Sequence, residues 1–396
     1  MTQEICPHFG ICGGCQTQNL PYAEQLKKKE AFVRENLNGL PAENFIPIIS
    51  SPQIYFYRNK MEFSFGDEND LRILKSKDVS GTHRVHLGLH PGGRFALVTP
   101  TAGCLLQSEE SQRILKLVAE WATATPNSVY VRKNNRGILR HLVIREGKKT
   151  GERMVNLFTA PDAAQVDLLA EALRSSGIPI KTFLWTVNSG ISDVAQGEVK
   201  RIFWGEGIIR ERLGKTILRV GPESFMQTNT LAAEGMIELL VRWLGKEAGG
   251  EILLDLYCGS GPIGLNLCPG FNKLVGIESN ETAVADAMEN ALRNGVREAE
   301  FHLGAVEKLL PDLMNAYSGR RKTVIVDPPR AGLHSKALEA LLAGAPDSIY
   351  YVSCNPESLA RDLRALVSKY RILNVQPMDF FPHTNHVETA VRMRIV

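Results

Sequence analysis

The chain has 396 residues, of which 44% are hydrophobic and 22% are charged, and its formal net charge is +3. This length predicts two or three modules, each with an ample hydrophobic core. A membrane-spanning helix needs about 18 or more apolar residues in a row, and the sequence has no such run. Residues 1–14 also lack the basic and then apolar layout of a signal peptide. We therefore expect a cytoplasmic protein without membrane association, and a monomer by default.

Three of the seven cysteines lie close together in the segment C-P-H-F-G-I-C-G-G-C, as Cys6, Cys12 and Cys15. Clustered thiols in a cytoplasmic protein indicate a metal site rather than disulfides. A site of four thiolates needs one further ligand, and Cys104, in T-A-G-C-L-L-Q, is the best candidate. The spacing fits neither paired zinc knuckles nor the motif of radical enzymes, so zinc and an iron–sulfur cluster stay open as alternatives.

The first half of the chain predicts a helix followed by a mixed module. Residues 22–38 have apolar side chains at helical spacing and predict an amphipathic helix, which Gly39 and Pro41 would end. Short β-rich runs separated by Gly, Asn and Asp then continue to about residue 220. Strands are expected at 60–65, 84–89, 139–146, 155–159 and 182–187, and helices at 109–124 and 163–175. This mixture predicts an α+β module.

From residue 222 onward, helical segments alternate with buried strands. The strands are expected at 252–257, 274–278, 299–303, 324–327, 348–353 and 387–395. Such alternation is typical of a Rossmann-like, doubly wound α/β sheet. We therefore expect three parts: a cysteine segment with its helix over 1–45, a central α+β domain over 46–221, and an α/β domain over 222–396.

A glycine-rich loop follows the first strand of the α/β domain, in L-L-D-L-Y-C-G-S-G-P-I-G-L. It places Gly259, Gly261 and Gly264 in a G-x-G-x-x-G turn that opens a helix. Glu278 ends the next strand, where an acidic side chain can hold ribose hydroxyls. Asp255 precedes the turn and no Lys–Ser/Thr pair follows it, which favours S-adenosylmethionine over NAD or a phosphate loop. The alternative is a tight turn in an ordinary α/β domain.

Two further motifs place reactive side chains at the ends of later strands. I-V-D-P-P-R-A-G-L puts Asp327 at the end of one strand, and Y-Y-V-S-C-N-P puts Cys354 at the end of another. Ligands bind at this edge of open α/β sheets. Asp-Pro-Pro also occurs in methylases of exocyclic amines and does not choose the reaction. A cysteine does, because C5 of uracil becomes nucleophilic only after a thiolate adds to C6.

The proton on C5 must be removed by a base before the thiolate can leave. The segment F-F-P-H-T-N-H-V-E-T supplies Glu388 for this step. We interpret His383 and His386 as structural or RNA-contacting residues rather than catalytic ones. The ordinary alternatives are a buried, inert thiol for Cys354 and a salt-bridged strand residue for Glu388.

The motifs S-C-N-P, D-P-P-R-A-G, D-L-Y-C-G-S-G, S-F-M-Q-T-N and F-P-H-T-N-H-V-E, with the cysteine segment, resemble the bacterial RNA uracil-5-methyltransferase family over nearly the whole chain. The resemblance implies that Cys354 is the nucleophile and Glu388 the proton acceptor, with S-adenosylmethionine as methyl donor. It implies that Phe225 is the base-stacking aromatic. The donor and uracil sites would be lined by Gln227, Tyr257, Glu278 and Asp327.

The resemblance also bears on the metal and on RNA binding. Members with this cysteine segment carry a four-iron, four-sulfur cluster, which here implies a structural 4Fe-4S cluster on Cys6, Cys12, Cys15 and Cys104. Basic residues gather at 27–29 and 132–145 and are candidate phosphate contacts. Within the second group, L-R-H-L-V-I-R is similar to a family segment that faces RNA, so Arg140 and His141 are expected to contact the substrate.

The expected substrate is a uridine of 23S rRNA, flipped out of its RNA fold. Ribosomal RNA is favoured because the tRNA-specific bacterial relatives usually lack the cysteine cluster. Transfer RNA is the alternative, because some archaeal tRNA enzymes have the cluster. Two departures from the family pattern bear on this expectation: no small β-barrel domain precedes Cys6, and Pro262 stands where some relatives have Asn. An RNA cytosine-5-methyltransferase and a non-catalytic RNA-binding iron–sulfur protein are the remaining alternatives.

Overall fold

The computed structural model describes residues 5–74, 84–192, 194–245 and 250–396. The chain forms two compact units. The first comprises Met1–Pro21, Tyr55–Glu211 and Gly221–Glu223, and the second comprises Tyr22–Ile54, Arg212–Val220 and Ser224–Val396. The expected division at 45 and 221 differs from this one, because the chain from 22 to 54 joins the α/β unit: its strand pairs with a strand near the C-terminus.

The first unit is built on a seven-stranded sheet of order β4-β3-β2-β5-β6-β7-β8. Its strands are β2 (Lys60–Asp67), β3 (Val85–Leu89), β4 (Thr99–Pro100), β5 (Leu139–Glu146), β6 (Arg153–Thr159), β7 (Thr182–Val187) and β8 (Glu198–Trp204). Its helices are α2 (Glu68–Leu74), α3 (Glu109–Ala124) and α4 (Val166–Ser175). Neighbouring strands are antiparallel except β6 and β7, which α4 connects. This confirms the predicted α+β class.

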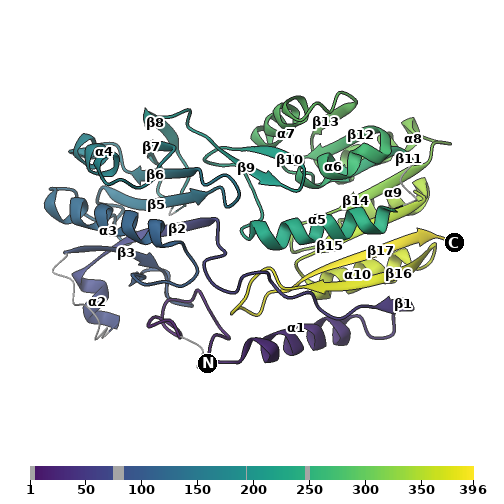
Figure 1. The fold of residues 1–396 in the computed structure, drawn as a ribbon, viewed down its shortest axis with the longest axis horizontal. Coiled ribbons are helices and arrows are strands. Elements are labelled where there is room, and N and C mark those ends of the chain that lie inside the picture. The colour runs from purple at the N-terminus through teal and green to yellow at the C-terminus, as the bar shows by residue number, and fades with distance from the viewer. Residues whose placement is uncertain (1–4, 75–83, 193, 246–249) are drawn as a thin grey trace. The chain divides into compact units, whose positions relative to one another are not determined.

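The second unit contains an eight-stranded sheet of order β1-β16-β17-β15-β14-β11-β12-β13 (Figure 1). Its strands are β1 (Ala42–Phe45), β11 (Gly250–Leu256), β12 (Phe271–Glu278), β13 (Ala299–Leu303), β14 (Lys322–Val326), β15 (Ser348–Ser353), β16 (Tyr370–Met378) and β17 (Glu388–Ile395). Only the pairs made by β17 are antiparallel. The predicted Rossmann-like sheet is confirmed. Strands β9 (Ile209–Leu213) and β10 (Thr216–Val220) form a separate pair.

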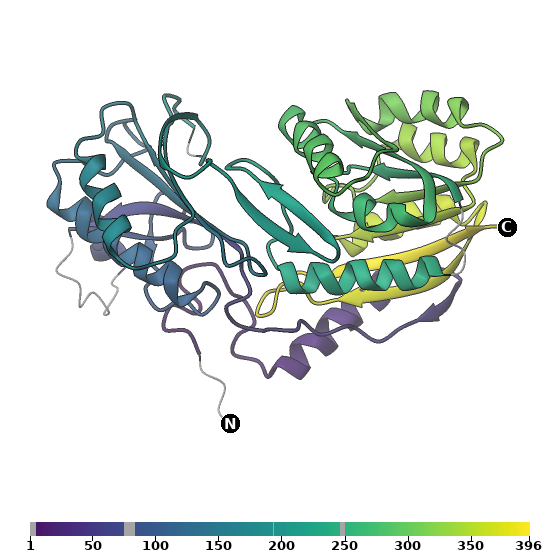
Figure 2. The same ribbon diagram turned by 45° about the horizontal axis from the view of Figure 1, so that its top comes forward.

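Helices cover both faces of the eight-stranded sheet, which Figure 2 shows from a second direction. One face packs against α1 (Tyr22–Asn36), α8 (Val306–Ala316), α9 (Ser335–Gly344) and α10 (Pro356–Leu366). The other packs against α5 (Thr230–Leu244), α6 (Pro262–Leu267) with the short 3₁₀ helix η2 (Cys268–Gly270), and α7 (Glu281–Arg293). None of the helices among the described residues combines the length and the apolar character that crossing a membrane requires.

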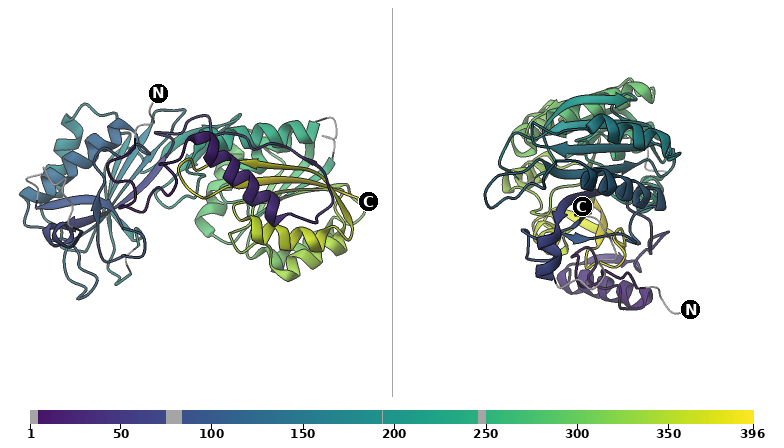
Figure 3. Two further views of the ribbon diagram at one scale, coloured as in Figure 1. Left: turned by 90° about the horizontal axis from the view of Figure 1, so that it is seen from below. Right: turned by 90° about the vertical axis from the view of Figure 1, so that its left-hand side faces the viewer.

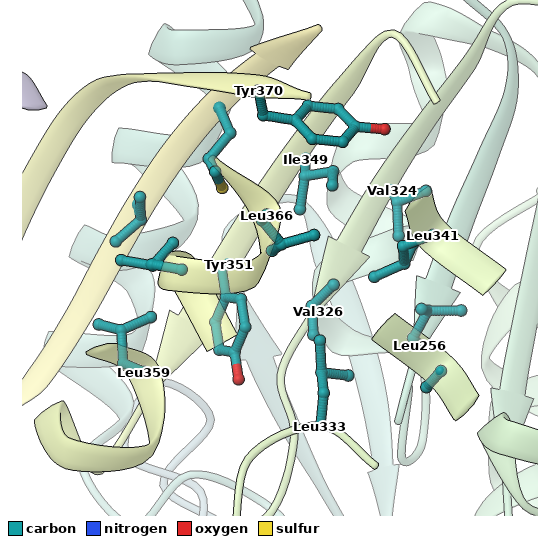
Figure 4. Packing of buried hydrophobic residues seen from close by; sticks show 14 of the residues in the cluster. Leu256, Val324, Val326, Leu333, Leu341, Ile349, Tyr351, Leu359, Leu366 and Tyr370 are labelled. Atoms are coloured by element: carbon teal, nitrogen blue, oxygen red, sulfur yellow. The ribbon is translucent and has the colours of Figure 1, made fainter. Parts of the chain in front are cut away.

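The central strands are apolar on both sides because they are covered on both sides. In β14, Val324 and Val326 join the apolar cluster on the α8–α9–α10 face, whereas Ile325 joins the opposite cluster. In β15, Tyr351 lies on the first face and Tyr350 on the second. Figure 4 shows the first cluster, in which the strand residues meet side chains of α9 and α10. This alternation follows from the two-residue period of a strand.

Helix α1 lies against α10 and β16, where Figure 3 shows it beside the yellow strands. Its fully buried side chains are Gln25, Lys29 and Val33, which follow one another at four-residue spacing. Two of these three side chains are polar, so the buried stripe differs from the purely apolar one that the sequence predicts. The loop that these polar groups contact leads into β17, as described below.

Candidate active site

Side chains from five neighbouring strands meet at one edge of the eight-stranded sheet. Tyr257 follows β11, Glu278 ends β12, Asp327 follows β14 and Cys354 follows β15. Because these strands are parallel, their carboxyl ends share an edge. Strand β17 runs the opposite way, so its first residue, Glu388, lies at the same edge. The topology thus brings together the candidate residues predicted from separate motifs.

The glycine loop after β11 has the backbone conformation that its sequence predicts. Tyr257, Gly259 and Gly261 have φ angles of 61°, 54° and 83°, in the left-handed region that favours glycine. The backbone N–H of Gly264 donates to Asp255 Oδ2 at 2.9 Å. A Cβ atom on Gly264 would lie 2.5 Å from that oxygen. Only glycine therefore allows the helix α6 to start so close to the end of β11.

Glu278 joins the glycine loop to the end of β12. Its Oε2 accepts the backbone N–H of Gly259 at 3.1 Å. Its Oε1 accepts the N–H groups of Ser279 at 2.7 Å and Asn280 at 2.8 Å. The carboxylate is therefore held beside the loop at the position where this fold class binds a ribose.

The pocket beside the loop is mostly apolar but includes two acidic residues. Its lining includes Gln227, Asp255, Tyr257, Gly259 and Asp327. Burial raises the pKa of Asp255 to about 7, aided by the charges of Asp327 and Glu278 and opposed by the Gly264 N–H. Burial also raises the pKa of Asp327 to about 7, against a hydrogen bond from Gln227. The two carboxyl groups of this otherwise mostly apolar pocket favour a cationic ligand, and the sulfonium of S-adenosylmethionine is such a ligand.

Cys354 lies between β15 and α10, directly before the residue that caps the helix. Asn355 is this cap: its side-chain oxygen accepts the N–H of Glu357 at 3.2 Å, and its Nδ2 donates to the carbonyl of Arg330 at 3.0 Å. The N–H of Asn355 donates to Ser353 Oγ at 3.1 Å. Residues on both sides of the half-buried Cys354 are thus fixed by hydrogen bonds.

Charges around Cys354 disfavour its thiolate. Burial, aided by the charges of Glu388 and Asp327 and opposed by Arg330, raises the pKa of Cys354 to about 11. Glu388 is 3% exposed, and burial together with the charge of Asp327 raises its pKa well above the usual range. Arg330 again acts in the opposite direction. The thiol, the two carboxyl groups and the guanidinium therefore form one electrostatically coupled site.

The loop after β14 is anchored from beneath by Asp362, a residue that the sequence does not single out. The Asp362 carboxylate is fully buried and accepts the N–H of Leu333 and the hydroxyl of Tyr351, at 2.8 and 2.7 Å. Arg361 donates to its other oxygen. Gly332, with a φ of 78°, leaves room for this pair. The Asp-Pro-Pro-Arg segment is thereby held in place, which only the fold reveals.

The segment S-F-M-Q-T-N places an aromatic side chain in solvent near the pocket. Phe225 is 66% exposed, an unusual state for a phenylalanine. Gln227 contacts Asp327, as noted above, and both line the pocket with Phe225. Asn229 caps α5 by accepting the N–H of Ala232 at 3.1 Å. The cap fixes the segment, and the exposed ring is free to contact a ligand.

The four candidate metal-binding cysteines lie near one another in the first unit, and all four are free thiols. Burial, aided by the charges of nearby cysteines, raises the pKa of Cys15 to about 12 and that of Cys104 to about 11. Arg58 lowers them, and its buried Nε has no hydrogen-bond partner among the described residues. No three His, Cys, Asp or Glu side chains in the described part of the chain are arranged to hold a single metal ion.

The predicted RNA contacts Arg140 and His141 are both buried in β5. The Arg140 guanidinium donates to the carbonyls of Asn188 at 3.0 Å and Gly190 at 2.6 Å, and also to that of Ser192. These bonds hold the loop after β7. His141 Nδ1 lies 3.3 Å from a serine hydroxyl of β2. Contact of either side chain with RNA stays a prediction.

Exposed cations near this strand are more accessible to a polyanion. Arg132, Lys133 and Arg136 are exposed in the loop before β5. In the other basic group, Lys29 is buried, whereas its neighbours Lys27 and Lys28 are exposed. Counting charges along the sequence therefore overstates the exposed positive charge of the group at 27–29 by one residue. The sequence cannot distinguish a buried cation from an exposed one when its partner is distant.

Comparison with known proteins identifies the family. The family model for tRNA (Uracil-5-)-methyltransferase matches residues 169–395. An uncharacterized RNA methyltransferase of Caldanaerobacter subterraneus subsp. tengcongensis is 38% identical over 389 residues, or 97% of this chain and 83% of that protein. An uncharacterized RNA methyltransferase of Clostridium tetani is 37% identical over 398 residues, or 98% of this chain and 83% of that protein.

A solved structure is similar over the same length. The crystal structure of Pyrococcus abyssi tRNA (uracil-54, C5)-methyltransferase in complex with S-adenosyl-L-homocysteine has a TM-score of 0.79 and 31% sequence identity. The match covers 97% of this chain and 86% of that one. The resemblance inferred from the motifs is thereby confirmed. This chain belongs to the tRNA (uracil-5-)-methyltransferase family and is an S-adenosylmethionine-dependent RNA methyltransferase.

Proposed function

We propose that the protein methylates C5 of a specific uridine in 23S rRNA, with Cys354 as nucleophile and Glu388 as proton acceptor. The observation that carries this proposal is the register of two strands. Ser353 of β15 pairs with Thr389 of β17, so Cys354, directly after β15, and Glu388, the first residue of β17, lie at the same end of the two strands, where the Glu388 charge acts on the thiol. A thiol and a buried carboxyl group at one end of two paired strands can act on adjacent atoms of one pyrimidine ring.

The chemistry begins at the Cys354 sulfur. Its thiolate forms a bond to C6 of the uracil, and the C5–C6 π electrons shift toward the C4 carbonyl, which makes C5 nucleophilic. S-adenosylmethionine, when bound, supplies an electrophilic methyl group to C5. Glu388 then accepts the proton from C5, the released electron pair restores the C5–C6 double bond, and the C6–S bond breaks. Cys354 returns to its starting state.

The remaining site residues would bind and orient the two ligands. We assign the donor site to Tyr257, Gly259, Gly261 and Glu278, whose loop and carboxylate border the pocket. Gln227 and Asp327 would hydrogen-bond the edge of a uracil flipped out of its RNA. The exposed ring of Phe225 would stack on a base, as aromatic side chains do in RNA recognition.

We also propose that the cysteines hold a structural 4Fe-4S cluster, on Cys6, Cys12, Cys15 and Cys104. Cys6, Cys12 and Cys104 all lie close enough to Cys15 to raise its pKa, so the four thiols provide one donor set. The buried Nε of Arg58 offers a hydrogen-bond donor to an anionic group there. The cluster would support the fold of the first unit and its contacts with RNA.

Transfer RNA is the second candidate substrate. The Pyrococcus abyssi protein is named for uracil-54 of tRNA, and it resembles this chain over nearly its whole length. Against this, the resemblance of the cysteine segment to bacterial ribosomal RNA enzymes favours 23S rRNA. Arg140 and His141 remain proposed RNA contacts, to which we add the exposed Arg132, Lys133 and Arg136 as phosphate contacts.

The test is methyl transfer from radiolabelled S-adenosylmethionine to unmodified 23S rRNA or tRNA, followed by identification of the labelled nucleoside. Label in 5-methyluridine from 23S rRNA, lost with Cys354→Ala, is the expected result. Label in 5-methyluridine from tRNA alone would show that tRNA, not 23S rRNA, is the substrate, and the proposed reaction would stand. Label in 5-methylcytidine, or transfer that survives Cys354→Ala, would contradict the mechanism. Binding of RNA without transfer would support a non-catalytic protein.

A further inference from the structure

A buried ion pair joins helix α1 to the loop that precedes Glu388. Lys29 Nζ lies 2.6 Å from Asp379 Oδ1, and the two side chains are 4% and 0% exposed. The same ammonium donates to the carbonyl of Phe381 at 2.9 Å. Asp379 Oδ1 also accepts the N–H of Phe381 at 3.0 Å, and its Oδ2 accepts the hydroxyl of Tyr22 at 2.9 Å. One carboxylate thus ties two residues of α1 to the start of the loop.

Gln25, one turn before Lys29 on α1, holds the middle of the same loop. Its Oε1 accepts the backbone N–H of His383 at 2.8 Å, and its Nε2 lies 3.2 Å from His383 Nδ1. His383 has a φ of 68°, a left-handed conformation that a non-glycine residue adopts only when its surroundings impose it. Burial lowers the pKa of His383 to about 4, so its ring is neutral near pH 7. The Gln25 amide therefore pairs with a neutral imidazole.

The loop held by α1 ends at the residue directly before Glu388. It comprises residues 379–387 and connects β16 to β17. Met378 of β16 pairs with Glu388 of β17, so the position of the loop determines where Glu388 begins the strand. From the other side, Asn229 Nδ2 donates to the carbonyl of Phe380 at 2.9 Å. Hydrogen bonds from α1 and from the α5 cap therefore fix the loop on two sides.

We propose that α1 positions the catalytic base: Lys29 and Gln25, acting through Asp379 and His383, hold Glu388 where it can remove the proton from C5. This inference rests on the proposed roles of Cys354 and Glu388. The four residues are positioning residues and touch neither the RNA nor the methyl donor. Their contribution belongs to the elimination step, because nucleophilic attack by Cys354 depends on β15 and α10 instead.

The chemistry of the contact favours this role over simple stabilisation. A buried ion pair is often no more stabilising than apolar side chains of similar size, because both charges must be desolvated. It does, however, impose one geometry on the groups that it joins. Proton transfer requires such geometry, since a displacement of about 1 Å can cost about a hundredfold in rate. Polar residues in the buried stripe of α1 are therefore explained by the loop that they hold.

The experiment follows the covalent RNA–protein adduct with end-labelled substrate RNA on denaturing gels, under single turnover. The variants are Lys29→Met and Gln25→Leu, with Lys29→Arg to restore the charge. Glu35→Met, on the exposed side of α1, is the control. Circular dichroism and thermal melting establish that each variant is folded. Glu388→Gln provides the reference for a stalled elimination.

We expect Lys29→Met and Gln25→Leu to form the adduct within about twofold of the wild-type rate. They should resolve it about tenfold more slowly or worse, so that methylated adduct accumulates. Lys29→Arg should recover part of the resolution rate, and Glu35→Met should match the wild type. The inference is overturned if folded Lys29→Met and Gln25→Leu resolve the adduct at the wild-type rate, or slow both steps equally.

The same gels separate this inference from the proposed function on which it rests. If Glu388→Gln stalls the adduct while the two α1 variants do not, the role of α1 is wrong and the mechanism stands. If Cys354→Ala still transfers methyl groups, or Glu388→Gln resolves its adduct normally, the mechanism itself is wrong. Should Lys29→Met fail to fold, Gln25→Leu alone decides, because it removes no buried charge.

Discussion

Cys354 and Glu388 occupy the first position beyond the paired Ser353 and Thr389 at the ends of β15 and β17. Directly opposed residues of antiparallel strands have Cβ atoms roughly 5 Å apart and point to the same face. The register of β15 and β17 therefore brings the proposed nucleophile, just after β15, to the same sheet edge as the proposed base at the start of β17. Their proximity also has a cost, because the carboxylate of Glu388 disfavours the thiolate of Cys354.

This cost predicts a steep pH dependence for adduct formation. Burial and the neighbouring carboxylates raise the pKa of Cys354 to about 11, so the thiolate fraction grows about tenfold per pH unit below that value. We expect the single-turnover rate of adduct formation to rise with slope near one between about pH 6.5 and 9. Arg330→Gln should lower this rate at every pH in the range, because the Arg330 charge opposes the rise in pKa. A flat profile in the wild type would contradict the assigned surroundings of Cys354.

Alanine substitutions at two glycines of the second unit should change the free energy of unfolding in opposite directions. Gly264→Ala places a Cβ atom 2.5 Å from Asp255 Oδ2 and 2.9 Å from Leu274 Cδ1, so we expect a loss of about 1–3 kcal/mol in the free energy of unfolding. Binding of S-adenosylhomocysteine should weaken as well. Gly235→Ala, inside α5, meets no atom within 4 Å and should gain about 0.5–1 kcal/mol. Urea denaturation and calorimetric titration of both variants test this contrast, and equal stabilities would refute it.

Many strands could be predicted from the sequence, because they are rich in apolar residues and bounded by turn residues. The expected ranges 139–146, 182–187, 299–303 and 348–353 coincide with β5, β7, β13 and β15. Strand ends then place Asp327 and Cys354 at one edge without further information. Strands β1 and β16 were not predicted. β1 has only four residues, and β16 contains Pro377, which removes a backbone donor.

What the sequence could not reveal is which polar residues meet across long separations. Lys29 looks like part of an exposed basic run, and only the fold brings it to Asp379, 350 residues later. Arg140 likewise looks like a surface cation, whereas it holds the loop after β7. A charged residue has the same local pattern in both situations. The distinguishing fact is the distant partner, which no local spacing contains.

The proposed iron–sulfur cluster predicts that replacing Cys104 removes the bound iron, whereas replacing Cys268 does not. Cys104→Ser should abolish the brown colour, visible absorbance and iron content of anaerobically purified protein, since one of four proposed ligands is lost. Cys268→Ser is the control, because Cys268 is also buried but lies in the second unit, whereas the four candidate ligands belong to the first. It should retain the iron of the wild type. Zinc in place of iron in the wild type would favour a zinc site, and equal iron in both variants would exclude Cys104 as a ligand.

Asp255 predicts a variant that is more stable than the wild type at alkaline pH. Its pKa is raised from 3.8 to about 7 in the folded protein, chiefly by burial. A carboxyl group whose folded pKa is raised favours folding below its unfolded pKa, and this contribution is lost as pH rises through about 7. At about 1.4 kcal/mol per pKa unit, ionised Asp255 costs roughly 2–4 kcal/mol above that pH. Asp255→Asn removes this charge and keeps an oxygen that can accept the Gly264 N–H.

We therefore expect Asp255→Asn to gain about 2 kcal/mol or more in the free energy of unfolding at pH 8.5, and little at pH 4.5. Asp312→Asn, an exposed position on α8, should change stability at neither pH. Urea denaturation at both values gives the comparison. A stability gain would mean that the carboxyl groups of the pocket are maintained at the expense of folding, as expected where carboxylates are gathered for a cationic donor. An equal effect at both pH values, or none at pH 8.5, would show that Asp255 is not ionised against a penalty, and the attraction of the sulfonium would then rest on Glu278 and Asp327.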